Sequence, residues 1–557
     1  MVRNNDSRLY VNSNNDLMLE EFDNLEDNKQ IDIGDMDLEN TLIGKRRREH
    51  NEEEEWTTIT RNPKEQKYAK PLQHSTHTGF GRNKGQITDV FLQTTCVWHG
   101  MQEDIFVIWI CIKIVMVSYA AYKIYVDLVV VPDMPKIDVE EWWTNTDKKT
   151  QDTSIRRYKP LFTDVLQEQL RLKFNLYRSN LIKKKSINES WTYGTNSIAL
   201  GQIFAHWQYK YILRHRVTFL NQFDHFKTNI QGLDIHFVHV KPKVEMNVKV
   251  IPLLLLHGWP STFRDFYEMI PVLTTPQEGY DFVFEVVIPS LPGFIYSQAP
   301  TRPGMGPMQI AIIMSNLMKR LGFNAYYVHG SDFGHVIGSH MATYFDKQVL
   351  GLHTSFPLNF SKLSTWTWIL GGLWPSLVGQ GLEHKMYPVK DKIDFVLEEF
   401  GFMLLQGTKP DTIGIALSDS PVGLLSYYID RYMIFTNPES KYTEEGGITT
   451  YFDMTSLIDN VMLYYSTNSV TTSLRLFRES FNSTVEKTMT QIPTPVPTWA
   501  LRTKNELFHQ PDFVLKWKYP NLVGTTNLDF GGHFVALEKP KEVAFDLFLS
   551  VKKFREF

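Results

Sequence analysis

Short, almost uninterrupted runs of apolar residues alternate with helical patterns along the middle of the chain. Apolar runs at 250–256, 282–288 and 325–329 each end at a turn containing glycine or proline, and helical patterns at 262–273 and 307–321 lie between them. Strands with continuous apolar residues are typical of a parallel sheet covered by helices on both faces. The pattern therefore predicts an α/β fold with a mainly parallel sheet.

Less regular segments flank this alternation. Before it, a mixed region from Trp142 to about 247 combines helical stretches with one alternating apolar–polar strand at 232–240. After it, residues from about 360 to 495 lose the strand rhythm and look largely helical, and strands resume at 497–501 and 522–528. We interpret the interruption as a helical lid inserted into the α/β unit.

A long apolar segment at 105–131 precedes all of these elements. It exceeds the roughly 20 apolar residues that a helix needs to cross a bilayer. Lys113 within it would cost about 2.5–3.5 kcal/mol at the centre of a membrane helix, and less near one end, where its side chain can reach the surface. A buried helix of a soluble protein is the alternative, but no globular segment precedes it. We therefore predict a single membrane anchor.

Residues 1–100 differ in composition from the rest of the chain. They are rich in Asn, Asp and Glu, and the basic block 45–48 is followed by the acidic block 52–55. No helical or strand period is sustained, so we expect a mostly disordered, charged extension. We interpret the basic block as a solvated charge run beside its counter-charges, with a nuclear-import or polyanion-binding patch as the alternative.

Overall composition narrows the classes of chemistry. Lys and Arg number 58 against 62 Asp and Glu, which gives a formal charge of -4 and no global electrostatic reason to bind nucleic acid. The two cysteines, Cys96 and Cys111, lie close together near the N-terminus. A disulfide framework or a zinc site built from cysteines is therefore excluded elsewhere, and any chemistry must use other residues.

The segment Gly330–Gly334 has the pattern of a nucleophile elbow, which is a strained turn between a strand and a helix with glycine on either side. The elbow presents its third residue, here Asp332, whereas Ser331 is off centre. A Gly-Asp turn that caps a helix is the alternative. The segment His257–Pro260 follows another strand, where this fold supplies amides to an oxyanion, so we predict the amides of Trp259 and Phe333 as donors.

Two further residues complete a catalytic arrangement. His533 lies in a glycine-containing loop near the C-terminus, although a single histidine among 17 is more often structural. Glu506 follows the strand at 497–501 and could orient the imidazole, with Asp512 and Asp529 as rival acids. The order nucleophile, acid, histidine is the order expected in this fold.

From about Trp142 to its end the chain resembles the microsomal epoxide hydrolase family, and most of all the insect juvenile hormone epoxide hydrolases. The resemblance rests on six ordered motifs: His257–Pro260, the elbow around Asp332, Thr408–Thr412 with Asp419–Gly423, Asn460–Tyr464, Asn505–Leu507 and Gly531–Phe534. It implies an N-terminal meander at 140–247, an α/β-hydrolase core at 248–360 and 496–557, a helical lid at 361–495, and an anchor in the endoplasmic reticulum. Residues 1–100 have no counterpart in it, which leaves a lineage-specific extension or an error in the gene model.

The resemblance also implies a mechanism and a substrate class. Asp332 would attack an epoxide carbon to form an alkyl ester, and His533, supported by Glu506, would activate the water that cleaves the ester. The substrate would be a hydrophobic epoxide, juvenile-hormone-like or xenobiotic, and the product a vicinal diol. This chemistry requires neither a metal nor an organic cofactor.

The chain departs from the family where the family places its proton donors. Two lid tyrosines donate to the epoxide oxygen in the family, and the matching residues here are Phe402 and Phe477. Loss of a general acid typically costs about 10²–10⁴-fold in rate. The family also usually has Gly and Trp where this elbow has Ser331 and Phe333. Four other tyrosines within the lid could replace them as proton donors: Tyr427, Tyr428, Tyr464 and Tyr465.

Three interpretations remain. The first is an epoxide hydrolase with a rewired or weakened proton donor, favoured because Asp332, Glu506 and His533 occur together. The second is a membrane-anchored, hydrophobic-ligand-binding pseudoenzyme, favoured by Phe402 and Phe477. The third is a haloalkane dehalogenase or an esterase, whose leaving group needs no protonation.

Overall fold

The computed structural model describes residues 86–145, 152–181 and 190–557. The predicted disorder of residues 1–85 lies outside the described residues. For residues 86–100 the prediction of disorder is wrong, because these residues begin helix α1 (Gln86–Val129). The sequence contains no proline from 86 to 131, so a helix formed by the apolar segment can extend toward the N-terminus without interruption.

Helix α1 contains the predicted anchor. Its segment Asp104–Val129 has 26 residues and a mean hydropathy of 2.1, and none of its most apolar window is buried. It is the one helix in the described ranges that is long and apolar enough to cross a membrane. The helix ends at Val129, two residues before the predicted boundary.

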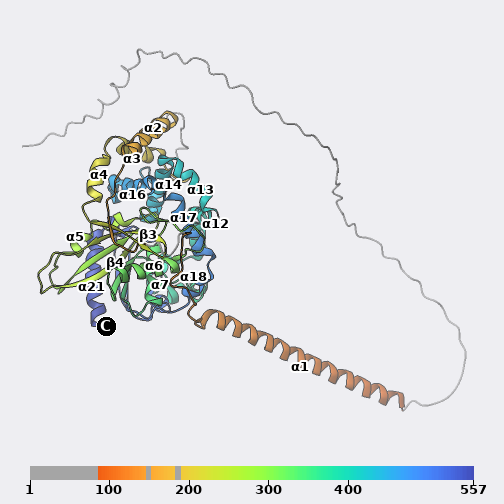
Figure 1. The fold of residues 1–557 in the computed structure, drawn as a ribbon. Helices are drawn as coiled ribbons and strands as arrows, with labels where there is room; N and C mark the ends of the chain where they lie inside the picture. The colour runs from red at the N-terminus through yellow and green to blue at the C-terminus, as the bar shows by residue number, and fades with distance from the viewer. Residues whose placement is uncertain (1–85, 146–151, 182–189) are drawn as a thin grey trace, which may run out of the picture. The chain divides into compact units, whose positions relative to one another are not determined.

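A nine-stranded mixed sheet forms the centre of the catalytic part (Figure 1). Its strand order is β1-β2-β3-β5-β4-β6-β7-β8-β9. Pairs between β5 and β9 are parallel, whereas β1, β2, β3 and β5 pair antiparallel. The strands are β1 (Arg156–Tyr158), β2 (His225–Ile230), β3 (Leu233–Val240), β4 (Lys249–Leu256), β5 (Phe282–Pro289), β6 (Tyr326–Gly330), β7 (Val349–Thr354), β8 (Thr498–Arg502) and β9 (Leu522–Asn527). The predicted α/β fold with a mainly parallel sheet is confirmed.

Helices surround this sheet. Its layers include α5 (Ile270–Leu273), α6 (Pro307–Arg320), α7 (Phe333–Tyr344), α19 (Asp512–Leu515), α20 (Val535–Glu538) and α21 (Pro540–Glu556). The expected single helix at 262–273 is wrong: a 3-10 turn, η2 (Phe263–Phe266), and the short α5 replace it. Pro271 has no N–H to donate, so a helix can begin just before it but cannot run through it.

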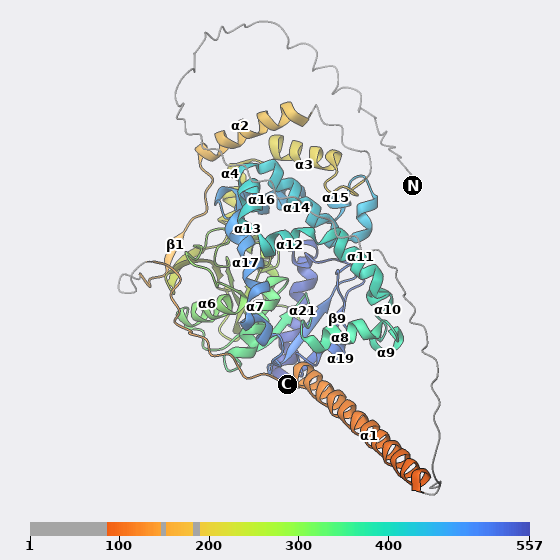
Figure 2. The same cartoon turned by 90° about the vertical axis from the view of Figure 1, so that its right-hand side faces the viewer.

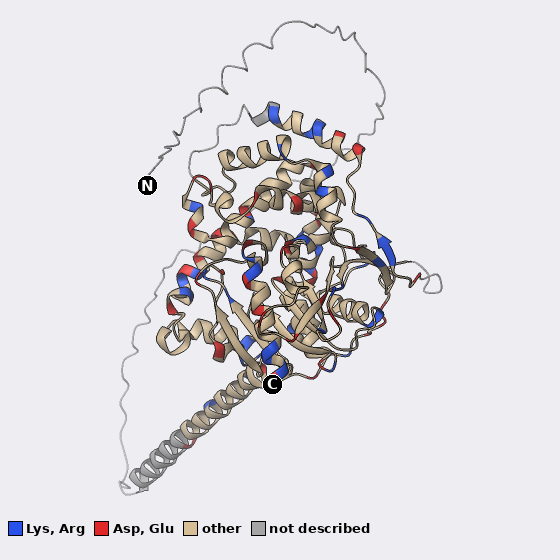
Figure 3. Cartoon of the chain, turned by 90° about the vertical axis from the view of Figure 1, so that its left-hand side faces the viewer, with Lys and Arg blue, Asp and Glu red and all other residues tan. Residues whose placement is uncertain are grey.

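The segment between β7 and β8 is almost entirely helical in its regular structure. It contains α8 (Lys362–Gly371), α9 (Pro375–Gly379), α10 (Glu383–Met386), α11 (Val389–Glu399), α12 (Gly401–Thr408), α13 (Pro410–Asp419), α14 (Pro421–Thr436), η3 (Pro438–Tyr442), α15 (Ile448–Tyr451), α16 (Met454–Ser466), α17 (Val470–Asn482) and α18 (Thr484–Met489). The earlier helices α2 (Asp164–Leu181), α3 (Ser197–Tyr209) and α4 (Leu213–Leu220) precede the sheet's central strands in sequence, and α2 and α3 pack on α14 (Figure 2). Basic and acidic residues are interspersed along the helices and strands of this catalytic part (Figure 3).

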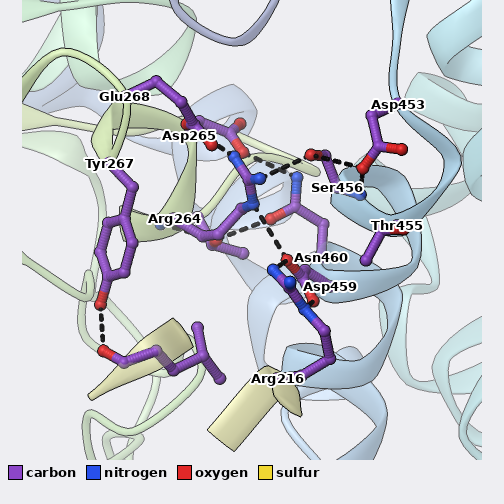
Figure 4. A network of polar contacts seen from close by, with 12 residues as sticks. Arg216, Arg264, Asp265, Tyr267, Glu268, Asp453, Thr455, Ser456, Asp459 and Asn460 are labelled. Atoms are coloured by element: carbon purple, nitrogen blue, oxygen red, sulfur yellow. Dashed lines mark hydrogen bonds and ion pairs between the residues drawn. The ribbon is translucent and has the colours of Figure 1, made fainter. Parts of the chain in front are cut away.

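A buried ionic network joins the lid to the segment after β4 (Figure 4). Asp459 on α16 accepts hydrogen bonds from Arg264 Nε at 3.2 Å and from Arg216 Nε at 2.8 Å. The neighbouring Asn460 donates to Asp265 Oδ1 at 2.8 Å. Removing one member would leave a buried charge unpaired, which is strongly destabilising. The network therefore holds α16 against η2, close to the predicted oxyanion segment.

Candidate active site

Asp332 occupies the sharp turn between β6 and α7. Its backbone has φ 52° and ψ −128°, a conformation that is strained for a residue with a side chain. A Cβ atom on Gly330 would lie 2.2 Å from the carbonyl oxygen of Gly334, so the turn closes only with glycine there. The structure therefore has the nucleophile-elbow geometry expected for this segment.

The Asp332 carboxylate faces the segment after β4. The amide of Trp259 donates a hydrogen bond to Asp332 Oδ1 at 2.8 Å. A Cβ atom on Gly258 would lie 2.3 Å from that oxygen, so glycine permits this close approach. Across the described part of the chain, Trp259 is the one residue whose amide hydrogen-bonds to this carboxylate. The proposed contribution of the Phe333 amide stays a prediction about the charge that develops during reaction.

His533 lies between two carboxylates. Its Nε2 is 3.4 Å from Asp332 Oδ2, and its Nδ1 is 3.0 Å from Glu506 Oε1. Glu506 Oε1 also accepts the Leu507 amide at 2.9 Å, which holds the carboxylate in place. The rival acids lie elsewhere: Asp512 pairs with Arg502, and Asp529 is exposed. The structure thus places Glu506, and neither rival, against the imidazole.

The two carboxylates control the charge of His533. Burial alone would lower the pKa of its imidazole, but Glu506 and Asp332 outweigh burial and raise that pKa to about 10. The two carboxylates therefore favour the imidazolium form of His533. Any event that removes the charge of Asp332 weakens this stabilisation and makes the imidazolium easier to deprotonate.

The loop that carries His533 is held by Glu538, a residue that the sequence analysis missed. Glu538 Oε2 accepts the Gly532 amide at 2.9 Å, and Oε1 accepts the Phe534 amide at 3.1 Å. Burial raises the pKa of the Glu538 carboxyl to about 7. The sequence feature that could have indicated Glu538 is a glutamate shortly after a glycine-rich loop, because such a carboxylate can accept hydrogen bonds from successive loop amides.

The two lid positions that match the family tyrosines lie together on Trp259. The Phe402 ring on α12 stacks on the Trp259 ring with centroids 5.7 Å apart. The Phe477 ring on α17 meets the same indole edge-on at 5.4 Å and the Phe333 ring at 4.8 Å. Both phenyl rings are buried, so these two lid positions present hydrocarbon and no hydroxyl beside Trp259.

The lid tyrosines considered as substitutes have other surroundings. Tyr464 donates its hydroxyl proton to the Ser261 carbonyl at 2.9 Å. The Tyr427 hydroxyl accepts a hydrogen bond from Gln406 Nε2 at 3.1 Å, and Tyr428 packs edge-on against Trp259. Tyr465 is half-buried, near Lys173 and Asp419. Within the described residues, none of these hydroxyls makes a hydrogen bond to Asp332 or His533.

The space beside the reacting groups is small. A cavity of about 20 Å³ is lined by Asp332, His533 and Ser261, among others. This volume holds a single water molecule. A larger cavity of about 480 Å³ lies between 299–305, 408–412 and α17, and neither Asp332 nor His533 lines it. The Asp332 side chain is nevertheless 26% exposed, so part of its surface is accessible to solvent.

Comparison with known proteins agrees with this geometry. Residues 141–266 match the family model described as "Epoxide hydrolase N terminus", and residues 251–379 match the model "alpha/beta hydrolase fold". The chain is 43% identical to a juvenile hormone epoxide hydrolase of Bombyx mori over 76% of this chain and 92% of that protein. It is 35% identical to epoxide hydrolase 1 of Oryctolagus cuniculus over 73% and 91% of the respective chains.

A solved structure extends the comparison to three dimensions. The crystal structure of the Bombyx mori juvenile hormone epoxide hydrolase superimposes with a TM-score of 0.72 and 42% identity, and the match covers 75% of this chain and 99% of that one. The relatives named here are enzymes, so the comparisons give the pseudoenzyme interpretation no support. The chain belongs to the epoxide hydrolase family of α/β-hydrolase enzymes.

Proposed function

We propose that this enzyme converts hydrophobic epoxides, of the juvenile-hormone-like terpenoid class or apolar xenobiotics, to vicinal diols through an ester on Asp332. The observation that carries the proposal is the alignment of Asp332, His533 and Glu506, with the Trp259 amide on Asp332 Oδ1. A carboxylate suits an epoxide because the alkyl ester that it forms can be hydrolysed, whereas the ether formed by a serine cannot readily be cleaved. The helix α1 would anchor the enzyme in the membrane of the endoplasmic reticulum.

Ring opening is the first half-reaction. Asp332 Oδ2 attacks an epoxide carbon, a C–O bond forms between them, and the bond from that carbon to the epoxide oxygen breaks. The electron pair of the broken bond stays on the oxygen, which becomes an alkoxide and requires a proton. The Trp259 amide on the other carboxylate oxygen orients Asp332 for this attack.

His533 supplies that proton in our account. Its imidazolium lies 3.4 Å from Asp332 Oδ2, within reach of a substrate oxygen directly or through one water. Phe402 and Phe477 carry no hydroxyl, and Tyr464 already donates to Ser261. Proton transfer leaves His533 neutral, which is the form that the second half-reaction needs.

Hydrolysis of the ester is the second half-reaction. Neutral His533, oriented by Glu506, takes a proton from water, and the resulting hydroxide attacks the ester carbonyl of Asp332. The amides of Trp259 and Phe333 would stabilise the oxyanion that forms there. Collapse of this intermediate breaks the bond from the Asp332 carbonyl carbon to the diol oxygen, and that oxygen takes the proton remaining on the added hydroxyl. The Asp332 carboxylate is restored, and His533 is again the imidazolium because it has taken a proton from water, so the protons balance over one cycle.

The experiment that tests this function measures diol formation. Purified enzyme in lipid nanodiscs receives a radiolabelled terpenoid epoxide of the juvenile hormone class and, separately, an apolar aryl epoxide. We expect diol from the terpenoid at a higher kcat/KM than from the aryl epoxide. Diol from neither substrate would contradict the proposed function, and a preference for the aryl epoxide would contradict the terpenoid assignment.

Restoring both lid hydroxyls should accelerate ring opening. The double substitution Phe402→Tyr/Phe477→Tyr places phenols at Trp259, where a second acid could donate to the epoxide oxygen. We expect ester formation in a single turnover to rise by up to about 10²-fold, the lower end of general-acid effects. Phe452→Tyr, which adds a phenol to a buried lid residue packed on Tyr432, is the matched control and should leave the rate unchanged. An equal or slower rate in the double variant would contradict the account.

The pH profile of ring opening should depend on Glu506. On the alkaline side, the rate in the parent enzyme should fall as pH rises through the His533 pKa of about 10, because ring opening uses the imidazolium. Glu506→Gln removes the carboxylate that contributes most to raising this pKa, so its alkaline decline should begin at lower pH. Asp512→Asn, at the rival acid, should keep the parent profile. Single-turnover ester formation measured across pH distinguishes the two, and coincident profiles for Glu506→Gln and parent would refute the assignment.

A further inference from the structure

Helices α8 and α9 expose an unusual number of large apolar side chains. Six of them, in the two helices and the turn between, are at least 41% exposed: Trp366, Ile369, Leu370, Leu373, Trp374 and Leu377. The first three lie three or four positions apart on one face of α8, the next two lie in the turn that follows, and the last lies in α9. We refer to these six residues as the α8–α9 face.

The sequence around this face is free of charge. No Asp, Glu, Lys or Arg occurs between Lys362 and Glu383, a stretch that includes both helices. A helix that faces water normally carries charged residues on its solvated side, and contiguous exposed apolar patches mark interaction sites. The α8–α9 face therefore does not have the character of a surface that remains in water.

The fold holds this face outward. On the other side of α8, Ser364 is buried and accepts a hydrogen bond from Gln510 Nε2 at 3.0 Å. The Trp368 indole donates to the Met386 carbonyl in α10 at 3.3 Å. Helices α8, α9 and α10 follow one another along one side of the catalytic part (Figure 2). Because these bonds fix the inner side, the apolar side chains point away from the core.

The start of α8 is also connected to the membrane-anchor helix. Lys362, the first residue of α8, forms an ion pair with Asp127 near the end of α1. This exposed pair contributes little energy, but it shows which part of the catalytic unit adjoins the end of the apolar span Asp104–Val129. The end of such a span lies at the boundary between hydrocarbon and headgroups, where tryptophan side chains are favoured. Trp366 and Trp374 provide two of them.

We propose that the α8–α9 face is a second membrane contact, which lies in the interfacial region of the same bilayer that holds α1. The occupant is the boundary between acyl chains and headgroups, which accommodates uncharged apolar side chains flanked by a lysine. The contact would place the first two helices of the lid at the lipid surface. One consequence, unlike the contact itself, rests on the proposed function. An apolar epoxide dissolved in the bilayer would meet the lid without passing through water.

Photolabelling from within the bilayer tests the contact. The full chain is placed in phosphatidylcholine nanodiscs in which a fraction of the lipid carries a diazirine on its acyl chain, and labelled peptides are identified by mass spectrometry. We expect label on the segment 363–379 in addition to α1. Ile415 on α13, which is 69% exposed, is the internal control and should remain unlabelled. Label confined to α1 would overturn the proposal.

A matched pair of variants separates lipid contact from contact with a second copy. Leu373→Asp/Leu377→Asp changes two residues that are 68% and 71% exposed, so the fold should be kept, as a thermal unfolding scan would verify. We expect label on 363–379 to fall at least about tenfold, since charge is excluded from the hydrocarbon boundary. Ile415→Asp should keep the parent labelling. A parent dimer that the double variant abolishes, without lipid label on 363–379, would overturn the proposal in favour of self-association. Diol formation from a water-soluble epoxide reports separately on the proposed chemistry. We expect its rate to be unchanged in both variants.

Discussion

Asp332→Asn should abolish both the protein-bound label and the diol when the enzyme is incubated with a radiolabelled epoxide. An amide is a poor nucleophile toward a saturated carbon, so the loss should be about 10⁴-fold or more. The Trp259 amide can still donate to the carbonyl oxygen of the new side chain, and the elbow backbone is unchanged, so the fold should persist. Single-turnover trapping followed by denaturation measures both products at once.

Ser331→Ala is the matched control for this prediction. Ser331 is the neighbouring residue in the same elbow, and a serine hydrolase would depend on it. In our account the alanine variant keeps ester and diol formation close to the parent rate. Loss of activity in Ser331→Ala with retention in Asp332→Asn would mean that the elbow presents serine, and it would favour the esterase interpretation.

His533→Gln should impair both half-reactions. Without the imidazolium, ring opening has no strong acid beside Asp332 and should slow by about 10²–10⁴-fold. Whatever ester does form should persist, because no base activates water at its carbonyl. The measurement is the time course of protein-bound label and of diol in a single turnover, with circular dichroism to verify the fold.

A triple variant separates the acid role of His533 from its base role. Adding Phe402→Tyr and Phe477→Tyr to His533→Gln returns a proton donor but not a base. We therefore expect ester formation to recover and the ester to accumulate without diol. If His533→Gln alone forms ester as fast as the parent enzyme, the proton for ring opening comes from another group and our assignment is incorrect.

Much of the fold could be predicted because the central strands are buried on both faces. Strands β4, β5 and β6 are mostly apolar runs, and such runs are distinctive. The strands β2 and β7 were missed for a physical reason. The sequence of β2 alternates with polar residues such as Lys227 and Asn229, and β7 is interrupted by Gly351 and ends in polar residues. Their strand conformation depends on pairing with neighbours that are remote in sequence.

The parts of the site that depend on backbone geometry could be predicted, because a sequence motif encodes that geometry. The parts that depend on the direction of a side chain were harder to predict. The elbow and the loop of His533 carry glycines whose positions reflect close approach, as the clash of a Cβ added at Gly330 with the Gly334 carbonyl oxygen shows. Glu538 contributes through its contacts with loop amides, which the sequence indicates only weakly. The directions of Tyr427 and Tyr464 depend on how the lid helices pack. Exposure of the α8–α9 face likewise requires knowledge of which side of α8 is buried.

The most direct test of the central claim, an ester on Asp332, is a single turnover in water enriched in ¹⁸O, with enzyme in excess over epoxide. If water attacks the ester carbonyl, the heavy oxygen enters the Asp332 carboxylate and the first diol carries an oxygen taken from the enzyme. We predict ¹⁸O in the peptide that contains Asp332 and none in that diol. Heavy oxygen in the diol, with none in the Asp332 peptide, would show that water attacks the epoxide directly and would contradict the account.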